Sequence, residues 1–225
     1  MADVGQAYAV QQAVNARRAS ARSGRKIGLT SLAVQRQIGV SEPDYGSIFT
    51  DAAYSTGARI PMSKLLQPRV EAEVAFVLAR NLDAEITLES VRNAIDYAVP
   101  AIEVVDSRVA GWDIRLEDTV ADNASFGAYV LGSERKTLEE LEPREVQMTM
   151  RVDGEVKSTG RGEDCLGDPL NAVLWLAETC ARLGDPLQAG EVVLSGALGP
   201  VVPVMALTKV VVEIRGLGTV EAVFE

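Results

Sequence analysis

Histidine is absent from this 225-residue sequence, and its absence removes several kinds of catalytic site. Without an imidazole there is no Ser-His-Asp triad, no Cys-His pair and no histidine general base. The common zinc and iron ligand sets are excluded too, because they draw on histidine or on several cysteines. Any chemistry therefore falls to carboxylates, lysines, hydroxyls, backbone groups or a hard metal ion held by oxygen atoms.

Positive charge, long apolar runs and cysteine are also scarce. Lys and Arg number 22 against 32 Asp and Glu, and a net charge of −10 offers no general attraction to nucleic acid or an anionic membrane surface. No apolar run approaches the ~18–20 residues that span a bilayer, and residues 1–26 lack the hydrophobic segment of a secretory signal. Cys165 and Cys180 form no CxxC pair. We therefore expect two free thiols in a cytoplasmic protein, with neither nucleic acid nor membrane as a partner.

What the sequence does contain is typical of one folded domain. Its 47% apolar and 24% charged residues match ordinary globular composition, and the length suits a single catalytic domain over 1–225. In the Ala- and Gln-rich segment 4–22, the apolar residues Val4, Tyr8 and Val14 are spaced roughly as one helical face. After it the pattern predicts a break at Gly24, a short helix over 32–38, a turn over 42–46 and an irregular segment over 51–68.

Most of the remaining chain has the pattern of strands. Positions 70, 72, 74, 76 and 78 are all apolar, and this period of two predicts a strand over 70–78. Helices are expected over 87–98, ended by Pro100, and from Asp168 to Gly184. Asp153-Gly154 is a strong hairpin signal. Further strands are expected over 101–105, 146–152, 191–195, 209–214 and 220–224, so the fold is predicted to be β-rich with a few helices.

Three glutamates stand out in the predicted strands. Glu71 and Glu73 are two residues apart on one strand and project from the same face, ~6.5–7 Å apart along the chain. Like charges this close are unfavourable unless they are solvated or share a cation, and Glu103 in the apolar run 101–105 is costly to bury unpaired. Three carboxylates without a histidine suit Mg²⁺ or Mn²⁺. Spacing alone leaves open a solvated strand edge for the first two and an ion pair with Arg108 for the third.

Six motifs follow one another along the chain. They are Lys26-Ile-Gly-Leu-Thr-Ser31, Pro43-Asp-Tyr-Gly46, Pro68-Arg-Val-Glu-Ala-Glu73, Pro100-Ala-Ile-Glu-Val-Val-Asp-Ser-Arg108, Asp118-Thr-Val-Ala-Asp-Asn-Ala-Ser125 and Leu194-Ser-Gly-Ala-Leu198. Through them, and over nearly its whole length, the chain resembles the 2-keto-4-pentenoate hydratase branch of the fumarylacetoacetate hydrolase superfamily. The resemblance implies an α+β fold, a β-rich roll or sandwich of the fumarylacetoacetate hydrolase C-terminal type with a few flanking helices.

The resemblance also concerns the N-terminal part of the chain. Members of this branch usually carry further, mostly helical residues before the segment that matches Ala7–Gln11. The helix over about 4–22 is therefore expected to be a shortened form of that region. It would precede a metal-binding, β-rich core over about 25–225.

The same resemblance implies roles for individual residues. It implies a divalent metal ion, Mg²⁺ or Mn²⁺, bound by three carboxylates, with Asp106 beyond them as support. It also implies an active-site lysine, an acid/base carboxylate and a Leu-Ser-Gly turn at the substrate's carboxylate end. The residues in these roles are Glu71, Glu73 and Glu103 for the metal, Lys26 and Asp44 for catalysis, and Leu29, Ser195 and Gly196 for substrate binding.

The substrate that the resemblance implies is 2-hydroxypenta-2,4-dienoate, an enol acid from the meta-cleavage of aromatic rings. Its carboxylate and C2 oxygen form a bidentate chelate that suits a hard cation with open positions. Protonation of the dienol gives an unsaturated 2-oxo acid, and water then adds at C4 to yield 4-hydroxy-2-oxopentanoate. We expect Asp44 to move the proton and orient the water, and Lys26 to bind a substrate oxygen.

Other functions stay open beside this one. A 4-oxalocrotonate decarboxylase of the same superfamily would use the same ligands to remove CO₂ from a diacid. A C–C bond hydrolase fits less well, because several of those relatives use a histidine-assisted water. A non-catalytic partner subunit of such a complex is the third alternative, although it would have no need of all five metal and catalytic residues. A homo-oligomer is expected, with a pathway decarboxylase or aldolase as a possible partner.

Three features outside the predicted site are expected to be structural. Asn123 should fix the loop after Asp118 rather than take part in catalysis. Arg108 should form an ion pair with Asp106 or Glu103, and the two cysteines should pack in the interior.

Overall fold

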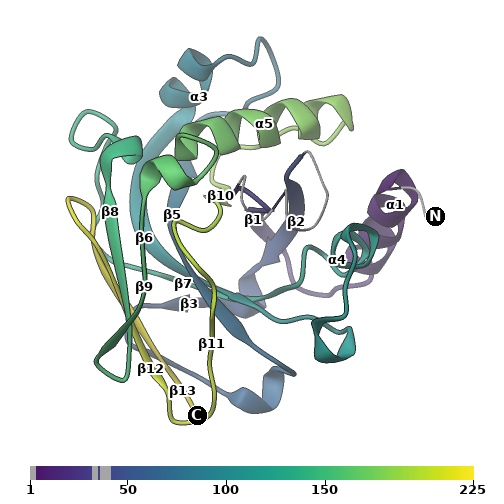
Figure 1. Ribbon diagram of the computed structural model, residues 1–225. Helices are drawn as coiled ribbons and strands as arrows, with labels where there is room; N and C mark the ends of the chain where they lie inside the picture. The colour runs from purple at the N-terminus through teal and green to yellow at the C-terminus, as the bar shows by residue number, and fades with distance from the viewer. Residues whose placement is uncertain (1–3, 32–34, 36–41) are drawn as a thin grey trace.

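Two mixed β-sheets form the centre of the computed structural model, which describes residues 4–31, 35 and 42–225 (Figure 1). The larger sheet has the order β2 (Asp44–Phe49), β1 (Arg22–Gly28), β10 (Val192–Leu194), β5 (Arg69–Leu78), β6 (Ile95–Val105), β7 (Phe126–Leu131) and β3 (Ala53–Ser55), and β11 (Val202–Pro203) also pairs with β5. The smaller sheet has the order β4 (Ala58–Ile60), β13 (Gly218–Phe224), β12 (Lys209–Ile214), β8 (Gln147–Val152) and β9 (Glu155–Arg161).

Helices cover the edges and one end of these sheets. The α-helices of the described chain are α1 (Val4–Asn15), α3 (Leu88–Ala94), α4 (Leu116–Ala121) and α5 (Pro169–Arg182), and the 3-10 turns are η1 (Thr50–Ala52), η2 (Met62–Lys64), η3 (Ala110–Trp112), η4 (Pro143–Glu145) and η5 (Gly162–Asp164). In Figure 1, α5 crosses one end of the sheets, while α1 and α4 lie side by side against the other flank. None of the described helices has the length and apolar character needed to cross a bilayer. The predicted β-rich α+β fold is confirmed.

The hydrophobic core fills the space between the two sheets. Strands β12 and β13 pack against β6, so one face of β6 is covered by the smaller sheet. Fully buried side chains from both sheets and from α5 meet there, among them Phe76, Ile102, Met150, Leu176 and Val212. Burial of this kind is worth about 1.5–3 kcal/mol for each large apolar side chain. The opposite face of β5 and β6 carries Glu71, Glu73 and Glu103 together with small apolar residues such as Ala75 and Ala101.

Several local sequence signals act as predicted. β5 spans the residues with apolar alternation. The β8–β9 hairpin turns at Asp153 and Gly154, whose φ angles of 51° and 86° are those of a type I′ turn. Helix α5 begins as expected, because a carboxylate oxygen of Asp168 accepts a hydrogen bond from the Leu170 N–H at 2.8 Å.

The helix predicted over 87–98 is shorter than expected. Thr87 caps it, but α3 ends at Ala94 and β6 begins at Ile95, so Pro100 lies inside a strand rather than at a helix end. Pro100 faces Val74 of β5, and the Val74 carbonyl accepts instead from the Ser195 N–H at 3.0 Å. The missing N–H of the proline therefore costs the β5–β6 ladder no hydrogen bond. The β-branched residues from Ile95 onward favour the strand once the sheet can pair with them.

The N-terminal predictions also need correction. Helix α1 ends at Asn15, and it buries Ala7 and Gln11, whereas Val14 of the predicted face is 55% exposed. The Gln11 side-chain amide donates to the backbone carbonyls of Tyr45 and Val120, so a polar residue anchors this helix. This tertiary contact outweighs the weak apolar periodicity of the segment.

Gly24 does not lie in the predicted break between elements but inside strand β1. A Cβ at this position would lie 1.9 Å from the Val192 carbonyl oxygen of β10, so the glycine serves a close approach of two strands. The predicted turn over 42–46 is wrong from Asp44 onward, where β2 begins, and the segment 51–68 includes β3 and β4. The helix predicted over 32–38 falls almost entirely outside the described residues.

Candidate functional site

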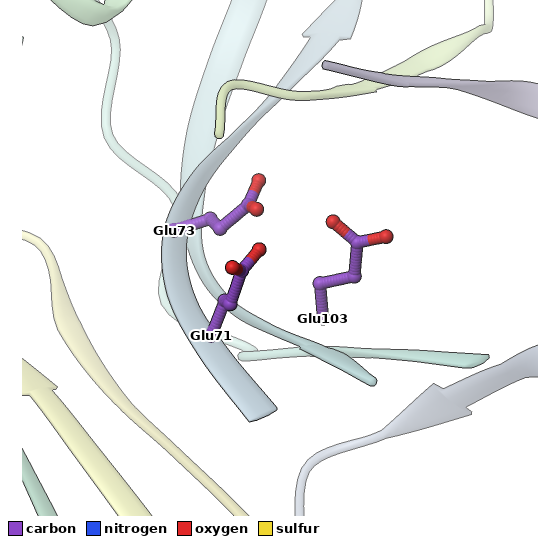
Figure 2. Close-up of side chains that lie close together, drawn as sticks. All are labelled: Glu71, Glu73 and Glu103. Carbon is purple, nitrogen blue, oxygen red and sulfur yellow. The ribbon is translucent and has the colours of Figure 1, made fainter. Parts of the chain in front are cut away.

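The three glutamates meet on the face of β5 and β6 that points away from the smaller sheet (Figure 2). Glu71 and Glu103 are directly opposite each other in the antiparallel pairing, and Glu73 is the next residue along on the same face. One carboxylate oxygen from each lies within 4.8 Å of the other two. Glu73 and Glu103 are fully buried, so this pair of strands is not a solvated edge.

The cluster has more negative charge than its protein neighbours satisfy. Glu73 Oε2 accepts a hydrogen bond from the Gly196 N–H at 2.7 Å. Glu73 Oε1 and Glu103 Oε2 are buried with no hydrogen-bond partner among the described residues, and Glu103 Oε1 is paired only with the ammonium of Lys26, whose Nζ lies 3.1 Å away. Burial raises the pKa of Glu71 to about 7 and also raises the pKa of Glu73, with the charge of Glu103 adding to both shifts. An all-oxygen set with unsatisfied oxygens fits a hard divalent cation.

Lys26 approaches the glutamates from β1 and is almost fully buried. Burial by itself lowers the pKa of the Lys26 ammonium, but the carboxylates of Glu103 and Asp44 outweigh burial, and the net pKa is raised above its usual value. These neighbours favour the charged form of the side chain, which is a hydrogen-bond donor. The predicted pairing of Arg108 with Glu103 or Asp106 is wrong, because the side chain of Arg108 forms its ion pair with Asp122.

Asp44 stands at the start of β2 beside Lys26. Burial raises the pKa of its carboxyl, and the positive charge of Lys26 opposes that rise. Gly28 leaves the room that this carboxyl occupies, since a Cβ there would lie 2.2 Å from Asp44 Oδ1. The sequence contains Gly28 within a motif, but only the tertiary contact explains why a glycine is needed.

A cavity of about 200 Å³ opens beside the lysine and the aspartate. Its apolar wall comes mainly from α4 and the segment before it, and its polar wall from β1, β2 and β5. The lining residues are Lys26, Gly28, Leu29, Asp44, Arg69, Glu71, Val105, Trp112, Ile114, Arg115, Leu116, Thr119, Ala124, Ser125 and Val201. Leu29 is thus placed where a substrate could touch it, with a left-handed backbone (φ 56°).

Ser195 and Gly196 are not among the residues that line this cavity. They lie behind Glu73: Gly196 donates to its carboxylate, and the Ser195 carbonyl accepts a hydrogen bond from the Cys165 thiol at 3.2 Å. Gly196 has φ 101°, and a Cβ there would lie 2.4 Å from Thr30. Contact of this turn with a substrate stays a prediction, whereas its contact with Glu73 is direct.

The loop that closes one side of the cavity has an unusual backbone. Asn123, Ala124 and Ser125 all have positive φ, between 51° and 58°, a conformation that costs roughly 1–2 kcal/mol per residue. Asn123 holds it in place, since its side-chain oxygen accepts from the Ser47 N–H and its amide donates to the Ser47 carbonyl, both at 2.8 Å. The predicted structural role of Asn123 matches these contacts. Cys165 and Cys180 are free and buried, as expected.

A comparison with protein families matches residues 10–225 to the model described as fumarylacetoacetate (FAA) hydrolase C-terminal. The chain belongs to the fumarylacetoacetate hydrolase family. It is 54% identical over 99% of its length to the TodF product hydratase of Pseudomonas putida, of which it covers 84%. It is 53% identical over 97% of its length to the 2-keto-4-pentenoate hydratase of Burkholderia vietnamiensis, of which it covers 85%. The resemblance to the hydratase branch is therefore confirmed.

A solved structure of the fumarylacetoacetate hydrolase family is also very similar. The 4-oxalocrotonate decarboxylase from Pseudomonas putida G7, complexed with magnesium and adipate, matches 99% of the chain and 86% of its own chain with a TM-score of 0.95 and 35% identity. Metal binding in this relative agrees with the acidic cluster found here. The chain thus shares its fold with both kinds of enzyme that the sequence suggested.

Asp106 directly follows β6, the strand that carries Glu103, and holds the loop at residues 66–67. It is nearly fully buried, and its two carboxylate oxygens accept from the Leu66 N–H at 2.9 and 3.1 Å and from the Gln67 N–H at 2.7 Å. The predicted supporting role is thus given a specific form, the anchoring of residues 66–67 to the end of β6.

Replacing Asp106 with Ala is expected to lower the free energy of unfolding by about 2–3 kcal/mol, because charge-assisted hydrogen bonds to two N–H groups are lost. Urea denaturation monitored by circular dichroism measures the change. Asp113→Ala removes an exposed carboxylate of a nearby loop and should stay within about 0.5 kcal/mol of the original protein. Equal effects of the two substitutions would contradict the anchoring role.

Proposed function

We propose that this protein is a metal-dependent hydratase that adds water to 2-hydroxypenta-2,4-dienoate to give 4-hydroxy-2-oxopentanoate. One observation carries the proposal: Glu71 of the Glu71-Glu73-Glu103 cluster lines the same cavity as Lys26 and Asp44, and Lys26 forms an ion pair with Glu103. Relatives at 53–54% identity that bear hydratase names support it. Metal ligation by the three glutamates, proton transfer by Asp44 and binding of a substrate oxygen by Lys26 are part of the proposal.

The chain's own residues would share the reaction as follows. Glu71, Glu73 and Glu103 would hold Mg²⁺ or Mn²⁺, which when bound supplies Lewis-acid stabilisation of enolate charge. Lys26, kept cationic by its neighbours, would donate a hydrogen bond to a substrate oxygen. Asp44, whose pKa is raised by burial, would transfer the proton and orient the attacking water.

Apolar residues of the cavity, with Leu29 on one side, would exclude bulk water around the carbon chain of the substrate. The turn at Ser195 and Gly196 would fix the orientation of Glu73 in the metal-binding set. Leu29, Ser195 and Gly196 were predicted to bind the substrate, and these two roles are the ones that their contacts in the structure support.

The direct test is a steady-state assay on 2-hydroxypenta-2,4-dienoate with and without EDTA, followed by addition of Mg²⁺ or Mn²⁺. We expect turnover to fall to background in the chelator and to return with either ion, because three carboxylates without a histidine favour such ions. Calorimetric titration of the metal-free protein would measure ion binding independently of activity. Activity that ignores the chelator would refute metal dependence.

Decarboxylation is a second candidate because of the similarity to the magnesium-bound 4-oxalocrotonate decarboxylase. The same purified protein should be given 4-oxalocrotonate while release of CO₂ is followed. We expect hydration of the dienoate to be the faster reaction by at least an order of magnitude, since hydratases are the more similar relatives in sequence. The reverse order of rates would favour the decarboxylase.

The biological setting proposed for this enzyme rests on its resemblance to the hydratase branch. We propose that residues 1–225 act as one catalytic domain, assembled as a homo-oligomer, in a pathway that degrades aromatic compounds. A decarboxylase or aldolase of such a pathway is the proposed partner. Two free, buried cysteines suit a reducing compartment, and we propose the cytoplasm.

A further inference from the structure

Arg69 is a cation in the cavity wall that none of the functions above uses. It is the first residue of β5, two positions before Glu71, so its side chain leaves the same face of the strand as the two glutamates. Its backbone is fixed on both sides, by pairing with Val105 of β6 and with Pro203 of β11. A side chain placed on so rigid an element starts from a well-defined position.

The guanidinium of Arg69 has an aromatic neighbour but no acidic one. Its central carbon lies 4.2 Å from the centroid of the Trp112 ring, at cation–π distance. Within the described chain no carboxylate lies within ion-pair distance of Arg69. Its hydrogen-bonding fork is therefore available to a carboxylate that enters the cavity.

Trp112 is itself held firmly in place. Its indole N–H donates to the Gln67 carbonyl at 3.1 Å, and the Gln67 side chain bonds to the Ser107 carbonyl at 2.9 Å and to the Gly111 N–H at 3.0 Å. Trp112 has a φ of 58°, rare for a large side chain, and such strain is kept only where surrounding contacts enforce it. The ring is thus a fixed platform beneath the guanidinium.

The charge of the site calls for a further cation when an anionic substrate binds. Glu71, Glu73, Glu103 and Asp44 face one buried lysine, so a bound divalent ion still leaves a negative balance when all four are ionised. A substrate carboxylate would be repelled by this balance. Arg69 and the more exposed Arg115 are the two arginines of the cavity wall, and Arg69 is the one next to the glutamates along a strand.

We propose that Arg69 binds the carboxylate of the substrate and that Trp112 acts as a positioning residue for its guanidinium. This inference rests on the proposed function, because it concerns the anionic end of the substrate in the same cavity. Arg69 would determine affinity and the requirement for an acid, while the proton transfer stays with Asp44.

The test compares Arg69→Gln and Arg69→Lys with the original enzyme loaded with Mg²⁺. We expect Arg69→Gln to raise KM for 2-hydroxypenta-2,4-dienoate roughly 10- to 100-fold with less than about a threefold change in kcat. Arg69→Lys keeps the charge but loses the planar fork, so its KM should be intermediate. Arg135→Gln is the matched control, because Arg135 also lies over an aromatic ring, that of Tyr97 at 4.3 Å, but outside the cavity.

Calorimetric titration supplies a readout without turnover. Pyruvate and its neutral amide differ only in the carboxylate, so the loss of Arg69 should weaken pyruvate binding by the same roughly 10- to 100-fold and leave the amide nearly unchanged. Trp112→Leu should weaken pyruvate binding by roughly 3- to 10-fold. Magnesium affinity should not fall in any of the variants, because Arg69 is a cation and no ligand.

The outcomes distinguish a failure of the proposed hydratase function from a failure of the role given to Arg69. An inactive original enzyme would refute the proposed hydratase function, while pyruvate titration would still test Arg69. An active enzyme whose KM and pyruvate affinity are within twofold in folded Arg69→Gln would overturn the inference. If Arg69→Gln does not fold, judged by thermal unfolding, Arg69→Lys and Trp112→Leu decide: unchanged KM in both overturns the inference, and raised KM in both supports it.

Discussion

Glu71→Gln is expected to lower kcat/KM roughly a thousandfold and to abolish the response to added Mg²⁺. A bound metal ion contributes several kcal/mol of transition-state stabilisation, and each ~1.4 kcal/mol is a factor of ten in rate. Glu71 is the best of the three glutamates for this test. It lines the cavity and is only partly buried, and no backbone N–H in the described part of the chain donates to its carboxylate, so an amide of equal size disturbs the fold least.

Metal affinity is the readout that ties this loss to ligation. Titration calorimetry of Mg²⁺ should show binding at least about 100-fold weaker in Glu71→Gln, since a charged oxygen ligand becomes a neutral one. Glu213→Gln makes the same chemical change on an exposed position of β12 in the smaller sheet and should behave as the original enzyme. Unaltered magnesium affinity in the Glu71 variant would remove this glutamate from the ligand set.

Asp44→Asn is the second substitution with a large expected effect. The amide keeps the shape of the carboxyl in the space that Gly28 leaves, but it cannot exchange a proton. We expect kcat to fall roughly 10²- to 10⁴-fold, the usual contribution of general acid–base catalysis, with magnesium affinity nearly intact. A loss below about tenfold would show that Asp44 does not carry the proton.

The pH profile of the original enzyme gives a further check on Asp44. The acid limb of kcat/KM reports the pKa of the essential base in the free enzyme. Because burial raises the pKa of Asp44, its ionised form is lost at a higher pH than that of an ordinary aspartate, and the limb should shift in that direction. Asp96→Asn, an exposed position at the start of β6, should leave both kcat and the limb unchanged. A limb that persists in Asp44→Asn would assign it to another group.

Most of the strands, the β8–β9 turn and the start of α5 were predictable because each depends on the sequence of a few neighbouring residues. The alternation in β5 and the turn at Asp153-Gly154 act over a few residues, and so does the cap at Asp168. The motifs of the family placed Lys26 and Asp44 among the candidates, and these residues do lie together at one cavity. The errors lie where tertiary pairing outweighs local preference, as at Ile95–Val105, where sheet partners turn the end of a predicted helix into a strand.

Arg69 and Trp112 illustrate what sequence periodicity reaches and what it misses. The alternation that groups Glu71 with Glu73 also places Arg69 on the same face, so this arginine could have been found from spacing alone. Trp112 could not, because it comes from a separate loop that is held beside β5 by the hydrogen bonds of Gln67.

The sequence by itself determined that the site has no imidazole, that its candidate ligands are carboxylates, and that two of them share one strand face. These properties follow from composition and from a period of two, and both are local. Only the tertiary structure decided that Glu103 faces Glu71 across the strand pair, that Lys26 neutralises Glu103 from another strand, and that Ser195 and Gly196 lie behind Glu73. Register and burial arise from contacts between distant segments, and burial is what turns ordinary carboxylates into groups that need a cation.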